Sequence, residues 1–197
     1  MLPGKLAWLG LSLAASLAAG SASAQVSPTG ERQEAPFTVG AGGSAFTPDF
    51  NDGVMLGVTF WADYRPGFIA RHAGGLSIAG ELRDLNYRRS ASQTNLREDT
   101  YTAGVQYEWQ RFWSVRPYGR AMGGIGTIDF PSTSTYNHDS RGIGSFSGGA
   151  DFRLYQNVWL RADYEYQYWP GLFSRNLHPQ GVTVGVLYDF RARRPDF

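Results

Sequence analysis

The chain has 197 residues, of which 42% are hydrophobic and 18% charged, with 25 glycines and no cysteine. This content of apolar and aromatic side chains excludes a disordered chain, and the length suits one domain. The lack of cysteine excludes disulfides, thiolate metal sites, a cysteine nucleophile and lipid-modified cysteine. A mean hydropathy of −0.33 excludes a bundle of membrane helices. It does not exclude a membrane β-barrel, whose residues alternate between lipid and lumen.

The first 24 residues have the pattern of a bacterial secretory signal peptide. Lys5 precedes an apolar run over residues 6–20, and Ala22-Ser23-Ala24 forms a small-residue cleavage site before Gln25. We therefore expect residues 1–24 to be removed on export and residues 25–35 to form a polar leader; the alternative is an N-terminal membrane anchor. Lys5 is the only lysine, so the mature chain has 17 arginines and 17 acidic residues. With zero net charge, we expect no nucleic-acid partner.

From residue 37 onward, apolar and polar side chains alternate with a period of two, which is typical of β-strands. Residues 158–169 are the clearest case, because the odd positions between Trp159 and Trp169 are all charged or polar and the even positions are apolar or tyrosine. We predict eight strands of about ten residues, a length that suits tilted strands crossing a bilayer. They cover residues 37–46, 55–64, 75–87, 100–110, 116–128, 145–154, 158–169 and 181–190.

The connections between the predicted strands alternate in length from the third onward. The longer polar ones are residues 88–99, 129–141 and 170–180, and the shorter ones are residues 65–72, 111–115 and 155–157. Such sorting is expected of a barrel inserted from the periplasm. The predicted fold class is all-β: a closed, antiparallel, eight-stranded transmembrane β-barrel over residues 36–190. It is an up-and-down meander with short periplasmic turns and longer extracellular loops, followed by a short basic tail over residues 191–197.

The polar face of the strands is predicted to line the barrel interior. Its cations are all arginine, as expected for ion pairs in an enclosed space, and the face also carries Asp63, Arg116 and Asp189. The predicted lumenal charge network consists of Glu81, Arg83, Glu108, Arg120, Asp151, Arg153, Arg161, Asp163 and Glu165. The alternative is a soluble, exported, lipocalin-like barrel in which the faces are exchanged and an apolar cavity binds a ligand.

Aromatic residues near the strand ends are predicted to form two girdles at the lipid interfaces. They are Tyr64, Tyr87, Trp109, Phe130, Tyr155, Trp159, Tyr168 and Trp169.

The last predicted strand carries the most specific motif of the chain. Thr183, Gly185, Tyr188 and Phe190 have the spacing polar, any, glycine, any two, aromatic, any, aromatic. This motif resembles the closing β-signal of the small outer-membrane β-barrels, the family that includes the transmembrane domain of outer-membrane protein A. Residues 37–190 resemble that family throughout, and the segment 116–118 (RPY) resembles its fifth strand. The resemblance implies that the barrel-assembly machinery recognises the last strand. The signal usually ends the chain in that family, whereas here residues 191–197 follow it.

The strongest candidate for chemistry is His138-Asp139-Ser140, whose H-x-S spacing resembles lipid A deacylases of similar size. In those enzymes the His and Ser lie on a lipid-facing strand with a Glu nearby. Here the segment reads as a loop, and no Glu occurs between it and Glu165. We interpret it as a solvated loop and predict no enzymatic activity, no cofactor and no metal site.

The expected function is that of an integral outer-membrane barrel with a structural or surface role, exposed loops and a lumen filled by long side chains. We expect a monomer in the bacterial outer membrane, exported through the general secretory pathway and in contact with outer-membrane lipid. The alternatives are a lipid-modifying enzyme and a narrow gated pore.

Overall fold

The structure is a computed structural model that describes residues 37–49, 53–72, 74–87, 96–109, 114–129, 138–172 and 175–190. The chain divides into units 1–33 and 34–197, and all described residues belong to the second. The predicted signal peptide, polar leader and basic tail lie outside the described residues. Among the described helices, none has the length and hydropathy needed to span a membrane.

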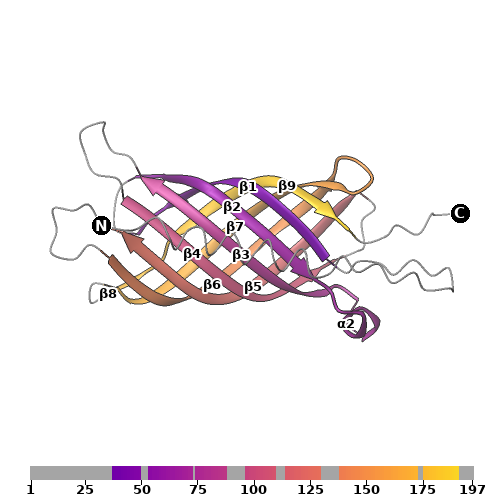
Figure 1. The fold of residues 1–197 in the computed structure, drawn as a ribbon, viewed down its shortest axis with the longest axis horizontal. Coiled ribbons are helices and arrows are strands. Elements are labelled where there is room, and N and C mark those ends of the chain that lie inside the picture. The colour runs from indigo at the N-terminus through magenta and orange to yellow at the C-terminus, as the bar shows by residue number, and fades with distance from the viewer. Residues whose placement is uncertain are drawn as a thin grey trace, which may run out of the picture. The chain divides into compact units, whose positions relative to one another are not determined.

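Eight long antiparallel strands close into a barrel (Figure 1). They are β1 (Phe37–Thr47), β2 (Met55–Tyr64), β3 (Leu76–Tyr87), β4 (Leu96–Glu108), β5 (Val115–Asp129), β6 (His138–Arg153), β7 (Val158–Leu172) and β9 (Gln180–Asp189). Consecutive long strands pair with each other, and β9 closes the ring by pairing with both β7 and β1. Each of the eight long strands thereby pairs with two neighbours, so none of them is an open edge strand, which lipid would not tolerate. The predicted closed eight-stranded meander is therefore confirmed.

The connections differ from the predicted ones in three places. Strands β5 and β6 stay paired as far as Asp129 and His138, so residues 129 and 138–141 of the predicted loop are strand. A three-residue strand, β8 (Arg175–Leu177), pairs with the end of β7. The connection between β2 and β3, predicted as short, contains the helix α2 (Gly67–His72). Connection length therefore distinguishes the two ends of the barrel less clearly than the sequence predicts. One reason is that the pairing of β5 with β6 continues through polar residues.

The barrel has two distinct ends, which we name by the chain. The loop end is where β1, β3, β5 and β7 finish, and the terminal end is where β1 begins and β9 finishes. Helix α2 lies at the terminal end (Figure 1).

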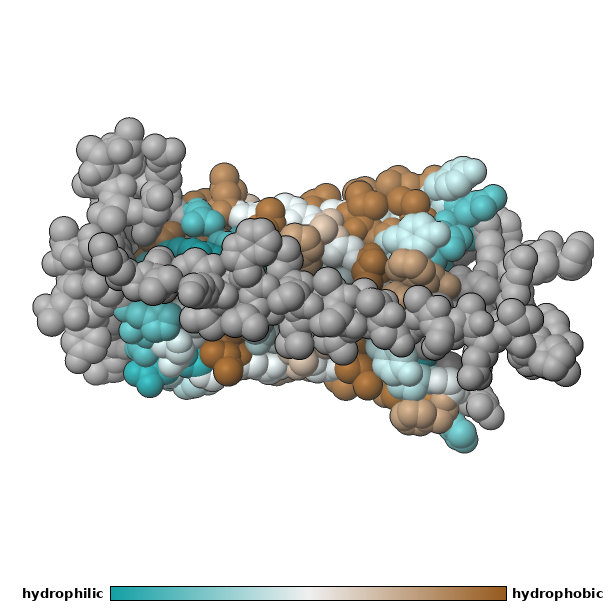
Figure 2. Space-filling model, in the orientation of Figure 1, coloured by the Kyte–Doolittle hydropathy of each residue, from teal (hydrophilic) through white to brown (hydrophobic). Residues whose placement is uncertain are grey.

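The two faces of the strands have the predicted chemistry. On β2, Val58 and Phe60 are 50% and 52% exposed on the outside, whereas Thr59 and Asp63 are buried inside. On the visible face of the barrel, apolar side chains lie along the middle of the wall and hydrophilic ones gather toward the ends (Figure 2). An apolar outer surface of this kind is typical of barrels that face lipid. The lipocalin-like alternative is wrong, because it needs the opposite faces.

The predicted aromatic girdles are only partly right. Tyr64, Trp109, Tyr155 and Tyr168 are exposed on the outside. Trp159 and Trp169 are not girdle residues, since they are 2% and 0% exposed inside the barrel. Both occupy odd positions of β7, on the same face as the buried arginine and carboxylates of that strand. Of the other two predicted members, Phe130 and the side chain of Tyr87 lie outside the described residues.

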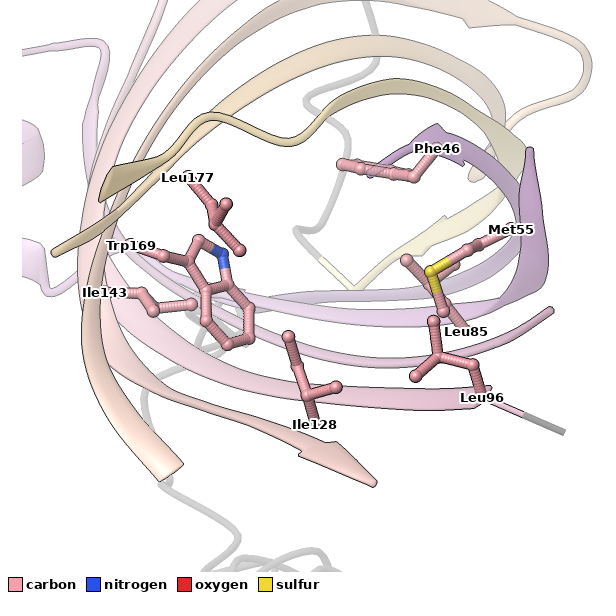
Figure 3. Close-up of a cluster of buried hydrophobic side chains, with 8 residues drawn as sticks. All are labelled: Phe46, Met55, Leu85, Leu96, Ile128, Ile143, Trp169 and Leu177. Carbon is pink, nitrogen blue, oxygen red and sulfur yellow. The ribbon is translucent and has the colours of Figure 1, made fainter. Parts of the chain in front are cut away.

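Apolar side chains close the lumen at the loop end (Figure 3). We call this cluster the apolar cap; its members are Phe46, Met55, Leu85, Leu96, Ile128, Ile143, Trp169 and Leu177. They come from seven strands and β8, and their side chains converge on the barrel interior. A second apolar cluster, of Trp61, Trp159 and Leu187, lies within the lumen closer to the terminal end.

Candidate functional site

The charged groups of the lumen form three layers below the apolar cap. The layer nearest the cap is built around Arg83. Its two terminal nitrogens donate to the two oxygens of Glu165 at 3.0 and 2.9 Å, and its Nε donates to Thr59 at 3.0 Å. Arg83 also pairs with Glu81. The guanidinium lies 4.0 Å from the ring centroid of Phe46, so the same side chain contacts the cap.

Arg120, on β5, completes this upper layer. It donates to Glu81 at 3.1 Å and to Ser147 at 3.1 Å, and it pairs with Asp163. Oxygens of Glu81, Asp163 and Glu165 lie within 4.8 Å of one another, a spacing that also suits a metal ion. Arg83 and Arg120 already donate to all three carboxylates, so guanidinium groups occupy the cation positions of this cluster. The geometry favours an ion-pair network over a metal site.

The middle layer is an arginine held by two aspartates. Arg161 donates to both oxygens of Asp151, at 2.8 and 3.0 Å, and to Asp63 at 3.1 Å. Its guanidinium lies 4.4 Å from the ring centroid of Tyr118. With Arg161 only 1% exposed, the charge is neutralised within the barrel rather than by water.

The lowest layer lies at the terminal end. Arg65 donates to Glu108 at 3.1 Å, and Arg116 donates to Asp189 at 2.8 Å. The guanidinium of Arg116 also stacks 3.6 Å above the ring of Trp159.

The structure places most of the predicted network inside the lumen. Eight of the nine residues are buried there: Glu81, Arg83, Glu108, Arg120, Asp151, Arg161, Asp163 and Glu165. Arg153 is only half-buried and lies 5.4 Å from the Trp159 ring, outside the central layers. Sequence reasoning missed Arg65 and Glu98, both buried in the lumen. Arg65 lies one residue after the predicted strand 55–64, and Glu98 lies two residues before the predicted strand 100–110. Both continue the alternation on the inward face of their strands.

The residues of the predicted β-signal all lie on or directly after β9. Thr183 points inward and hydrogen-bonds Ser44 across the β1–β9 seam at 2.9 Å. At Gly185, a Cβ would overlap the β1 backbone, so only glycine allows this close strand approach. Tyr188 and Phe190 face outward with their ring centroids 4.6 Å apart. The motif thus puts its small and polar residues on the closing seam and its aromatic residues on the outer surface.

His138, Asp139 and Ser140 are not in a loop, which corrects the sequence-based interpretation. They are the first three residues of β6, and His138 pairs with Asp129 at the end of β5. His138 Nδ1 lies 2.6 Å from an Asp129 oxygen, and His138 Nε2 lies 3.3 Å from Ser140 Oγ. An acidic side chain therefore lies beside His138, and it belongs to the neighbouring strand. Only the cross-strand register reveals it.

A model of the outer membrane protein beta-barrel domain matches residues 12–190 of the chain. The chain belongs to this family. Its barrel is accordingly of the bacterial outer-membrane type, and no curated protein matches it.

Solved structures of this type resemble the barrel. Neisserial surface protein A is 17% identical, with a TM-score of 0.62, over 80% of this chain and 99% of that chain. The attachment invasion locus protein of Yersinia pestis is 17% identical, with a TM-score of 0.53, over 77% and 95% of the two chains. The N-terminal barrel domain of Pseudomonas aeruginosa OprF is 13% identical, with a TM-score of 0.50, over 79% and 100%. At these identities the likeness shows the fold alone.

Proposed function

We propose that this chain is a monomeric surface barrel of the outer membrane whose lumen is closed to solutes. The observation that carries this proposal is the filling of the lumen: the apolar cap lies above three layers of paired charges. Arg83, Arg120 and Arg161 have side chains at most 1% exposed, so they leave no water-filled path beside them. Eight strands leave room for side chains but not for a channel.

The space that remains at the terminal end is small. A cavity bordered by Arg65, Glu108 and Arg116 encloses about 10 Å³, which is room for about one water molecule. The carboxylates of the three layers are engaged by arginines, which argues against a reaction among them. The role of the protein then rests on its outer wall and its loop end.

The loop end faces the cell exterior in this proposal. Export through the general secretory pathway follows from the signal-peptide pattern of residues 1–24, and insertion by the barrel-assembly machinery from the motif that ends at Phe190. The partner of the outer wall is outer-membrane lipid, because the wall is apolar around the ring. The zero net charge of the mature chain argues against nucleic acid.

Conductance tests the closed lumen. The folded protein, checked by heat-modifiable gel migration, is added to planar bilayers, with a general diffusion porin as the positive control. We expect no ion-conducting steps from this barrel. Regular single-channel steps would overturn the proposal and favour the gated pore.

Single-cysteine labelling tests the orientation, because the chain has no cysteine of its own. We compare Gly53→Cys at the loop end with Gln156→Cys in the turn between β6 and β7. A membrane-impermeant maleimide should label the first variant on intact cells and the second only after the outer membrane is broken. The reverse pattern would place the loop end in the periplasm.

A further inference from the structure

Three side chains on the outer wall at the loop end form a hydrogen-bonded relay. His138 Nδ1–H donates to Asp129 at 2.6 Å, since an ionised carboxylate only accepts. This fixes the tautomer and leaves Nε2 to accept from the Ser140 hydroxyl at 3.3 Å. The order serine, histidine, aspartate is that of a nucleophile, its general base and the group that orients the base.

The relay lies where the apolar wall ends. Ile125, two residues before Thr127 on the same face of β5, is 56% exposed and belongs to the lipid-facing surface. Thr127 pairs with Ser140, so the serine is about 7 Å along the strand from the last apolar side chain. On the neighbouring strand, the outward residues level with Thr127 and Asp129 are the charged Asp99 and Arg97. From this change from apolar to charged side chains we infer the boundary between hydrocarbon and headgroups, where the ester carbonyls of membrane lipids lie.

The wall just below Ser140 is bare backbone. Gly142 and Gly144 follow Ser140 on the outer face of β6, and Gly123 lies opposite Gly144 on β5. A Cβ at Gly144 would meet nothing within 4 Å, and one at Gly142 or Gly123 would make only ordinary contacts. Packing of the barrel therefore does not demand glycine here. No side chain of these glycines covers the wall between Ile125 and the serine hydroxyl, and His138 is 62% exposed.

We propose that Asp129, His138 and Ser140 form a serine-hydrolase site that cleaves acyl esters of outer-membrane lipids. The Ser140 oxygen attacks the ester carbonyl while His138 Nε2 takes the hydroxyl proton. The bond to the alkoxy group then breaks, and His138 returns the proton to that leaving group. Water, activated by the same imidazole, hydrolyses the acyl-serine and releases a fatty acid. The Thr127 hydroxyl, 3.1 Å from Ser140 Oγ, is the side chain placed to donate to the carbonyl oxygen as it gains charge.

Ser140 and His138 are thus catalytic residues, and Asp129 is a positioning residue. The site goes beyond the proposed surface role, and its failure would leave the conductance and orientation results untouched. The alternative is that these side chains form an exposed polar surface without reactivity. The two roles differ in whether the Ser140 hydroxyl reacts with an electrophile.

A fluorophosphonate probe tests the nucleophile without a chosen substrate. Folded protein in detergent micelles and in vesicles is treated with the probe, and the modified residue is located by peptide mass spectrometry. We expect labelling at Ser140, lost in Ser140→Ala and slowed at least a hundredfold in His138→Ala. The matched control is Asp139→Asn, in the same segment but with its side chain on the opposite face. No labelling of the correctly folded wild type overturns the proposal.

Vesicles of two lipid compositions then identify which lipid supplies the ester. The protein is folded into vesicles of phospholipid alone or of phospholipid with lipopolysaccharide, and released fatty acids and shortened lipids are measured by mass spectrometry. Release from either source, lost in Ser140→Ala, supports the proposal and names the substrate. No release from either overturns it.

Three further variants separate catalysis from structure. Asp129→Asn should lose about a thousandfold in rate and Asp129→Glu should recover most of it, because only a carboxylate holds the imidazole in the required tautomer. Gly144→Leu should cover this glycine stretch of the wall and raise KM about tenfold while fluorophosphonate labelling of Ser140 persists. If Asp129→Asn hydrolyses lipid as fast as the wild type, the relay is not the catalytic unit.

Discussion

The lumen is filled by apolar side chains at the loop end and by arginines with carboxylates in the middle, and these two regions exclude water in different ways. In the apolar cap, each side chain contributes through the surface it buries and needs no particular partner. In the charged layers, each group depends on its counter-charge, because a buried ion without one is strongly unfavourable. A deletion in the cap therefore leaves a cavity, whereas a deletion in a charged layer leaves an unpaired charge.

The two regions are joined rather than merely stacked. The indole N–H of Trp169 donates to Gln167 at 2.7 Å, and Gln167 donates to Glu165 at 2.8 Å. Arg83 binds Glu165 from below and stacks on Phe46 of the cap. The bridge through Gln167 satisfies the only polar atom of the Trp169 side chain, which lets a tryptophan complete an apolar cluster.

The largest effect is expected from Arg161→Leu, which leaves Asp63 and Asp151 without their cation. We expect the free energy of unfolding in lipid vesicles, measured with urea, to fall by about 4 kcal/mol. Adding Asp63→Asn and Asp151→Asn to the same chain should restore much of the loss, because no buried charge then remains unpaired. The control is Arg153→Leu, since Arg153 is half-buried at the terminal end and should matter much less. A neutral Arg161→Leu would show that water already screens this layer.

The next largest effect is expected in the cap. Trp169→Ala removes the largest fully buried side chain of the described residues and should cost about 3 kcal/mol in the same urea experiment. The charged layers below stay in place, so the variant should still conduct no ions in planar bilayers. Conducting steps from Trp169→Ala would show that the cap alone is the seal.

Gly126→Ala should cost less, about 2 kcal/mol, by overfilling the cap. A Cβ at Gly126 would overlap the Trp169 ring, so glycine at this inward position makes room for the indole. A double-mutant cycle checks the cause: in the Trp169→Ala background the second substitution should be nearly neutral. If the two costs simply add, the glycine is required by the backbone and not by the tryptophan.

The fold and the charged layers are readable from the sequence because both repeat with a period of two. Arg161, Asp163 and Glu165 occupy alternate positions of one long strand, and their face is evident from that strand alone. Leu187 interrupts the alternation of β9 and proves to be an inward residue packed with Trp61 and Trp159. Such an exception has meaning only once the opposite wall is known.

The cap and the outer relay were not readable, for a related reason. Leu96 lies before the predicted fourth strand and Leu177 within a predicted loop, so no local alternation assigned them to a face. Asp129 and His138 are nine residues apart in the sequence, and only the pairing of β5 with β6 places them side by side. A feature formed by residues from several strands can be predicted only when the pairing register of those strands is known, and local sequence patterns do not give that register.

The smallest effect is expected from Arg97→Leu on the outer wall. Arg97 lies between two aspartates, as Arg161 does in the middle layer, but this site is exposed. Arg97 donates to Asp84 at 2.8 Å and lies 3.2 Å from Asp99, much as Arg161 is held by two aspartates. The side chains of Arg97 and Asp84 are 49% and 38% exposed, so water and salt screen the attraction. We expect a loss below about 1 kcal/mol that shrinks as the salt concentration rises, whereas the loss from Arg161→Leu should not. Equal costs at both sites would mean that burial is not what distinguishes the lumenal network, and that the outer ion pairs are themselves shielded by bound lipid headgroups.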